Sequence, residues 1–188
     1  MIVKECKMPD ISDLKPSITG AFLLTSLVGL DANKTKDEIS CLSVIARLID
    51  KARYEYLIAR EATIDEEKEG KLTYDKIIKR DEGQYLFTFT IINHLENCLN
   101  ALSRIYKLHK LLTPKNQFLT PQKQNVNKTR NHIEHIEDRI ARSITGSRSL
   151  NISGDALTVE IAGENLNLND VANEIRLLYS EIRNIINK

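Results

Sequence analysis

The sequence predicts an all-α protein: an up-and-down bundle of four to five long helices with a small β-hairpin before the C-terminal helix. Apolar residues recur at three- and four-residue spacing over most of the chain, which is typical of amphipathic helices. Only 7 Gly and 4 Pro interrupt 188 residues. Strict alternation of apolar and polar residues occurs on both sides of Ser153-Gly154-Asp155 and predicts the hairpin at about 148–163. The length favours a single domain, residues 1–188.

The first two helices lie in the N-terminal third. Residues 16–30, after a cap at Ser12 or Asp13, form the first, with Ile18 and Phe22 among its inward positions. The second starts near Lys36 and ends in an acidic stretch, 65–70, that we expect to be solvated. Its inward positions are Ile39, Leu42, Ile45, Leu48, Ile49, Ala52, Tyr56 and Ala59.

The third helix covers residues 84–112. Its first part, 85–92, is rich in aromatic and β-branched residues and could form a strand on local preference. The unbroken continuation into an apolar stripe favours a helix there. A stretch bounded by prolines, 113–121, then breaks the pattern. The stripe consists of Leu95, Cys98, Leu99, Leu102, Ile105, Tyr106 and Leu112.

Two more helices complete the bundle. The fourth runs over 121–144, with Pro121 in its first turn and Gly146 after its end. Its polar face carries Asn131, Glu134 and His135, while Arg130 and His132 flank the apolar stripe. That stripe consists of Val126, Ile133, Ile136, Ile140 and Ile144. The last helix follows a cap at Asn169-Asp170 and turns Val171, Ile175, Leu178, Ile182 and Ile185 inward.

The composition excludes several classes of protein. A formal net charge of +1 argues against binding polyanions by bulk charge alone. Three widely spaced cysteines, Cys6, Cys41 and Cys98, fit reduced thiols better than disulfides or a zinc site with paired ligands. Residues 21–30, the longest apolar stretch, are too short to span a membrane, and the N-terminus lacks the order of a signal peptide. We therefore expect a cytoplasmic protein without a membrane partner.

Charge is nevertheless segregated along the chain. Residues 97–133 contain no Asp or Glu but seven Lys and Arg. This segregation predicts a local phosphate-binding face, with Lys107, Lys110, Lys123 and Lys128 as candidate RNA contacts. The alternative is a solvated helix end followed by a polar loop, whose lysines only keep the protein in solution.

The densest cluster of functional side chains follows this basic stretch. It contains the motif Arg130-Asn131-x-x-x-His135, which resembles the Arg-polar-x-x-x-His signature of the HEPN superfamily. That superfamily consists of small helical bundles, often dimeric. Many members are metal-independent endoribonucleases of toxin–antitoxin, abortive-infection and other defence systems. The resemblance implies RNA as substrate, a homodimer, an antitoxin or other regulatory protein as partner, and no cofactor or metal.

A ribonuclease without metal needs a base for the 2′-hydroxyl, a cation for the phosphorane and an acid for the leaving oxygen. His135 suits the acid/base role, and Arg130 can bind phosphate oxygens. Asn131 would orient the histidine or the phosphate by hydrogen bonding. Glu134 is spaced to pair with Arg130, and His132 is an accessory candidate. Because residues five apart point about 140° apart on a regular helix, we expect a composite site made by two subunits.

Two alternatives remain open. The polar face of the fourth helix could instead form a salt-bridged interface in a catalytically inactive RNA-binding or protein-interaction module. His132-x-x-His135, with Glu134, Glu137 and Asp138 nearby, could also bind a metal, although the paired Glu-x-x-His repeats of di-metal bundles are absent.

Overall fold

The computed structural model describes residues 3–15, 19–20, 34–70, 83–121, 123–135, 150–161 and 163–186. This part of the chain is mostly helical, with a small antiparallel sheet before the C-terminal helix, as predicted. Its elements are α2 (Lys36–Gly70), α4 (Gly83–His109), the 3-10 turn η1 (Pro114–Asn116), α5 (Gln124–Glu134), β1 (Leu150–Ile152), β2 (Thr158–Ile161), β3 (Glu164–Asn167) and α7 (Leu168–Ile186).

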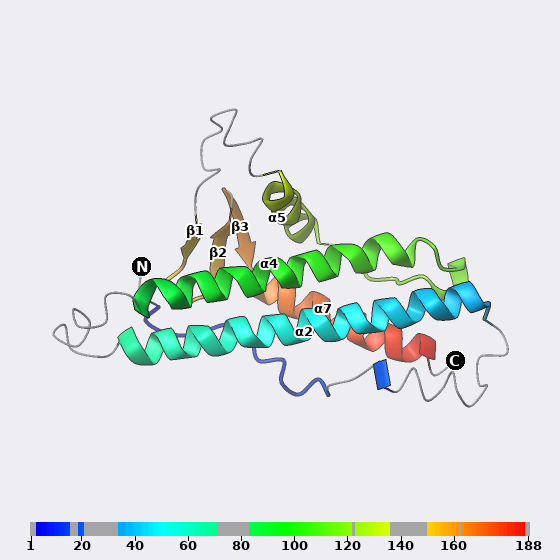
Figure 1. The fold of residues 1–188 in the computed structure, drawn as a ribbon, viewed down its shortest axis with the longest axis horizontal. Coiled ribbons are helices and arrows are strands. Elements are labelled where there is room, and N and C mark those ends of the chain that lie inside the picture. The colour runs from blue at the N-terminus through cyan, green and yellow to red at the C-terminus, as the bar shows by residue number, and fades with distance from the viewer. Residues whose placement is uncertain are drawn as a thin grey trace.

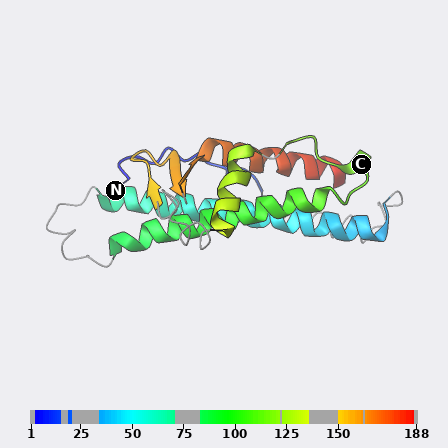
Figure 2. The same ribbon diagram turned by 90° about the horizontal axis from the view of Figure 1, so that it is seen from above.

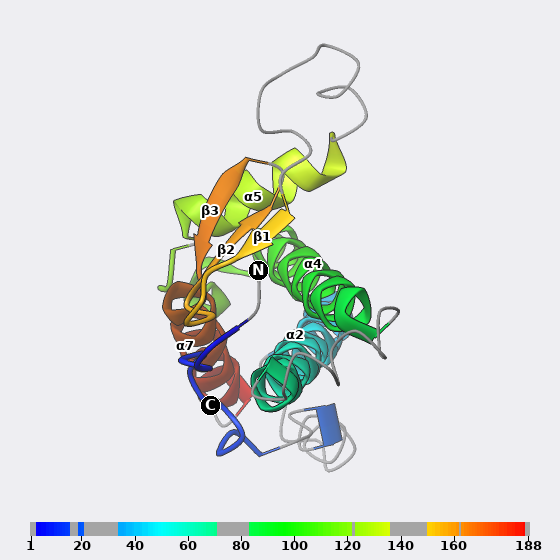
Figure 3. The same ribbon diagram turned by 90° about the vertical axis from the view of Figure 1, so that its left-hand side faces the viewer.

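The helices α2 and α4 form a long antiparallel pair, and α7 packs beside α2 (Figures 1 and 3). α2 begins at Lys36, as the sequence predicts. Residues 85–92 belong to α4, so helix rather than strand is correct there. The apolar stripe predicted for the third helix is buried throughout, from Leu95 to Leu112. Burial of this continuous stripe outweighs the local preference for a strand.

The acidic end of α2 differs from the prediction. Glu66 is buried, and its Oε1 lies 3.5 Å from the backbone N–H of Val3, which donates to it. The next residue, Glu67, accepts a hydrogen bond of 3.0 Å from the backbone N–H of Cys6. These carboxylates hold the N-terminal segment against α2, so this helix end is not simply solvated.

The sheet has one strand more than predicted. β2 pairs antiparallel with both β1 and β3, in the order β1-β2-β3. The β2–β3 turn contains Gly163 with φ 81°, a conformation that favours glycine. β3 has the polar sequence Glu-Asn-Leu-Asn and lacks the β-branched residues that indicate strands. Its single buried apolar residue, Leu166, completes one apolar face with Ile152, Val159 and Ile161.

The last helix starts slightly earlier than predicted. α7 begins at Leu168, and the side chain of Asn167 accepts a hydrogen bond of 2.9 Å from the backbone N–H of Asn169. Asn167 therefore caps the helix in place of Asn169-Asp170. The predicted inward residues of this helix are all buried: Val171, Ile175, Leu178, Ile182 and Ile185.

Some predictions fall outside the described residues. Of the first helix, 16–30, only residues 19 and 20 are described, and both are helical. The three cysteines are free thiols. Within the described ranges, no helix combines the length and apolar character needed to cross a membrane.

Candidate functional site

The helix that carries the motif is α5, which crosses α4 steeply and packs against both α4 and β3 (Figure 2). Its start differs from the prediction: α5 begins at Gln124, and Pro121 is not helical. The backbone N–H groups of Leu119 and Thr120 donate to the Glu181 carboxylate of α7, at 2.8 and 2.7 Å. These two hydrogen bonds hold the chain just before Pro121 against α7.

The end of α5 also differs. The helix ends at Glu134, and His135 is its C-cap, with φ −117° and ψ 26°. The projection of His135 onto a regular helix therefore does not hold, and the predicted extension to 144 falls on 136–149, outside the described residues. Asn131, Glu134 and His135 are exposed, in agreement with the predicted polar face.

Arg130 is buried, with 8% of its surface exposed, on the same side of α5 as Val126 and Thr129. Arg130 lies one turn after Val126, which agrees with its predicted place at the flank of the apolar stripe, and it is buried there. Its Nη2 pairs with Glu134 Oε1, as the spacing predicts, and its Nη1 donates a hydrogen bond of 3.0 Å to Asn131 Oδ1. Burial lowers the pKa of the guanidinium. The motif thus holds its arginine by its own neighbours.

Two further basic side chains of α5 meet one carboxylate from the sheet. Glu164 of β3 approaches Lys128 Nζ through Oε2 at 2.8 Å and His132 Nδ1 through Oε1 at 2.9 Å. Sequence reasoning missed Glu164 because its strand carries no apolar alternation. A single Glu in a polar stretch gives no signal that it faces a basic helix.

The first cation of the segment is held from α7. Lys123 Nζ lies 4.0 Å from Asp170 Oδ1, and Asn125 Nδ2 donates a hydrogen bond of 2.9 Å to Asp170 Oδ2. Asp170 was predicted only as a helix cap. It instead joins the start of α5 to the start of α7, so Lys123 is less available to RNA than the sequence predicts.

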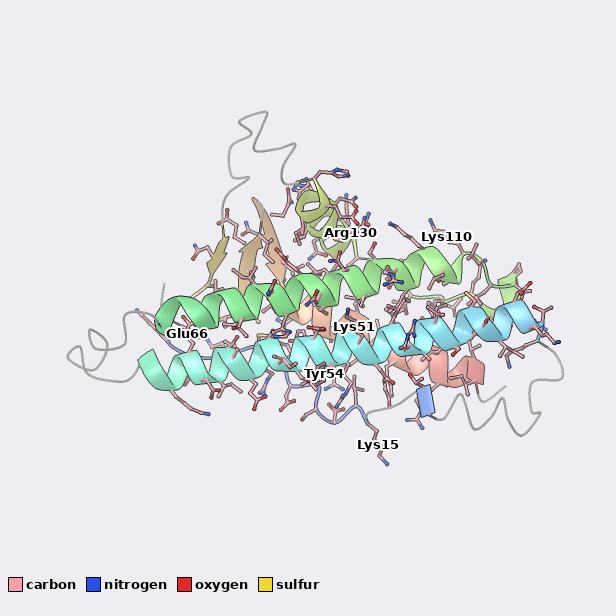
Figure 4. The ribbon with its side chains drawn as sticks, in the orientation of Figure 1. Lys15, Lys51, Tyr54, Glu66, Lys110 and Arg130 are labelled. Carbon is pink, nitrogen blue, oxygen red and sulfur yellow. The ribbon has the colours of Figure 1, made fainter. Side chains whose placement is uncertain are left out.

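The basic residues along and just beyond α4 have different surroundings. Arg104, Lys107 and Lys110 are exposed, and no carboxylate of the described residues pairs with them. Arg104 and Lys107 are three residues apart and so share one side of α4, and Lys110 directly follows the end of this helix. Figure 4 shows Lys110 and Arg130 on the same side of the α2–α4 pair, opposite Lys15. Lys110 therefore lies on the same side of the pair as the motif arginine.

A buried carboxyl group lies below the start of α5. Glu174 of α7 is fully buried, and neither carboxyl oxygen has a hydrogen bond of ordinary geometry within the described chain. Burial raises its pKa to about 7, while the Tyr106 hydroxyl and the backbone N–H of Lys123 act in the opposite direction. Glu174 therefore links α4, α5 and α7 through a group that titrates near neutral pH.

The predicted site residues are thus only partly brought together. Arg130, Asn131 and Glu134 form one contact group, and His132 and Lys128 form another with Glu164. Among the described residues, no three His, Cys, Asp or Glu side chains gather as metal ligands, and Glu137 and Asp138 lie outside those residues. No protein-family model matches the sequence, and neither the curated proteins nor the solved structures contain a significantly similar one.

Proposed function

We propose that this protein is a HEPN-like, metal-independent endoribonuclease of a toxin–antitoxin or anti-phage defence system. The observation that carries the proposal is the motif at the end of α5. There the Arg130 guanidinium is held by Asn131 and Glu134, and the exposed His135 follows one residue later. A fixed cation and an exposed imidazole are two of the groups that this chemistry requires.

In the proposed reaction the 2′-hydroxyl of RNA attacks the adjacent phosphorus. A base takes the hydroxyl proton, the phosphorane forms, and an acid protonates the departing 5′ oxygen. The products are a 2′,3′-cyclic phosphate and a 5′-hydroxyl end. His135 supplies one proton-transfer group, and Arg130 stabilises the phosphorane charge. A second subunit would supply the remaining group across a homodimer interface.

The surface along α4 supports RNA as the ligand. Arg104 and Lys107 on α4 and Lys110 just after it are exposed without carboxylate partners among the described residues. Such cations gain from phosphate contact without first losing an internal ion pair. We therefore assign phosphate binding to Lys107, Lys110 and Arg104 before Lys123 and Lys128.

The test is cleavage of mixed cellular RNA by the purified protein in EDTA, with product ends analysed for 2′,3′-cyclic phosphate. We compare wild type with His135→Ala and Arg130→Lys. The lysine keeps a positive charge but loses the forked donors of arginine. Both variants should lower the cleavage rate at least about 100-fold.

Matched controls change the same residue types elsewhere. His94→Ala removes an imidazole that contacts Glu55 on the α2–α4 seam, and Arg47→Lys alters an exposed arginine of α2. Both should cleave like wild type, and circular dichroism checks the fold of each variant. Absence of cleavage by wild type, or equal loss in the controls, would contradict the proposal.

One observation favours a second candidate, a catalytically inactive RNA-binding or protein-interaction module. Arg130 is buried and its guanidinium is already paired with Glu134, as expected for an arginine that stabilises its own helix. RNA binding that depends on Lys107 and Lys110, together with no cleavage in any buffer, would identify this module.

A further inference from the structure

The position of Glu164 is fixed by the small sheet. It directly follows Gly163 in the β2–β3 turn and stands opposite Ile161 in the register. Side chains alternate along a strand, so Glu164 shares its face with the buried Leu166. That face meets α5, because β3 and α5 are in contact. The sheet therefore delivers one carboxylate to the basic helix.

The carboxylate bridges two basic side chains. Lys128 and His132 are one turn apart on α5, and each meets a different oxygen of Glu164, at 2.8 and 2.9 Å. A phosphodiester also offers two oxygens to neighbouring donors. In the free protein Glu164 thus occupies the position that an RNA phosphate would take on this face of α5.

The contact is shielded on one side and open on the other. The side chains of Glu164 and His132 are 17% and 20% exposed, whereas that of Lys128 is 57% exposed. An ion pair with such an exposed partner is weak, and a phosphate can replace its carboxylate. An incoming anion therefore reaches Lys128 from solvent while Glu164 still holds it.

We propose that Glu164 is an internal competitor for RNA phosphate, which limits anion binding on α5 until a ligand displaces its carboxylate from Lys128 and His132. This proposal rests on the proposed function for the identity of the ligand as RNA. It assigns the small sheet a regulatory role at the same site.

The chain offers a matched control in the neighbouring strand. Glu160 of β2 stands opposite Asn151 and Asn165, on the other face of the sheet from Glu164. It makes no ion pair within the described residues. Glu164→Gln and Glu160→Gln change the net charge equally, but only Glu164→Gln removes the carboxylate that contacts Lys128 and His132.

Two probes measure the effect: a short 2′-O-methyl RNA, which lacks the attacking hydroxyl, and inorganic tripolyphosphate. At low salt Glu164→Gln should bind each probe at least about threefold more tightly than wild type. Glu160→Gln should change either affinity by less than half of that factor. Circular dichroism checks the fold, and Glu164→Asp, which withdraws the carboxylate, replaces Glu164→Gln if the latter unfolds.

A double-mutant cycle with Lys128→Gln isolates the pair. Lys128→Gln should weaken binding little in wild type but should cancel most of the gain in Glu164→Gln. The proposal would be overturned if Lys128→Gln lowered the affinity equally in wild type and in Glu164→Gln, or if Glu164→Gln bound neither probe more tightly than wild type. Tighter binding of tripolyphosphate without any RNA binding would support the competitor and contradict the proposed function.

Discussion

The cations of α4 and α5 come from one acid-free stretch of sequence, residues 97–133, yet their surroundings in the fold differ. Arg104, Lys107 and Lys110 remain exposed without carboxylate partners among the described residues. Lys123, Lys128, Arg130 and His132 each lie within 4.0 Å of a carboxylate. A basic stretch in sequence therefore does not define a uniformly basic surface.

The difference has a topological cause. Three of these four basic residues, Lys123, Lys128 and His132, are met by residues that follow much later in the chain, Glu164 and Asp170. Glu164 in the sheet and Asp170 at the start of α7 lie next to these basic residues in the fold. Within the described residues, no carboxylate is placed in this way beside Arg104, Lys107 or Lys110. Counting charges along the sequence cannot predict these pairs, because their partners are far apart in the chain and meet only in the folded protein.

The largest expected effect is a loss of folding stability with rising pH near the start of α5, where the carboxyl group of Glu174 is buried. The pKa of Glu174 is raised from 4.5 to about 7, so its contribution to stability is complete below pH 4.5. It is lost as the pH rises through 7, because ionisation in the buried site is unfavourable. The loss amounts to about 3 kcal/mol, and chemical denaturation at several pH values measures it.

Glu174→Gln isolates this contribution from the other titrating groups. The variant should gain stability relative to wild type as the pH rises from 4.5 to 8, while Glu160→Gln should show no such trend. Amide hydrogen exchange should place the loss at the start of α5 and not at the exposed side of α4. A difference between the two proteins that is independent of pH would contradict the assignment.

The next effect compares the RNA affinity of the two cation groups. Neutralising Arg104, Lys107 and Lys110 together to Gln should weaken binding of single-stranded RNA by about two orders of magnitude at about 50 mM salt. The slope of affinity against salt should fall by about 2. These residues have no carboxylate partner in the described chain, so each substitution removes a phosphate contact and no internal ion pair.

Its matched control changes the paired group. Lys123→Gln with Lys128→Gln should weaken RNA binding by less than about tenfold, because both lysines already meet a carboxylate. Fluorescence anisotropy at several salt concentrations measures both variants. If the Lys123 and Lys128 variant loses as much affinity per substituted residue as the Arg104, Lys107 and Lys110 variant, pairing with a carboxylate does not affect RNA binding.

Much of the fold could be predicted because its helices bury continuous apolar stripes. The start of α2 at Lys36, the helical nature of 85–92 and the inward face of α7 follow from periodicity alone. The strand β3 could not be found this way, because a polar strand of four residues gains its stability from pairing with β2.

The site was predicted less completely. The pairing of Arg130 with Glu134 follows from helical spacing and is confirmed. The predicted helix continued beyond Glu134, where α5 ends, and nothing in the sequence indicated that Arg130 is buried. The burial of Arg130 depends on tertiary contacts, because α4 and β3 pack against α5 and leave little of this side chain exposed. The ribonuclease activity itself stays a prediction.

The smallest expected effect is the change in stability caused by Glu134→Gln, and it tests whether Arg130 binds phosphate or only stabilises α5. Arg130 is buried, but its partner Glu134 is 39% exposed and follows it by one turn, so solvent screens the pair and its expected contribution is about 0.5 kcal/mol. Glu134→Gln should therefore lower the melting temperature by no more than about 2 °C, similar to Glu61→Gln on the exposed side of α2.

The same variant has a functional readout that stability does not predict. If the guanidinium binds phosphate, removal of Glu134 should tighten binding of 2′-O-methyl RNA about twofold or more, while Glu61→Gln should leave it unchanged. A loss above about 2 kcal/mol without tighter binding would make Arg130 a structural arginine of α5. The paired cations would then stabilise the helix, and RNA contact would be confined to the exposed side of α4.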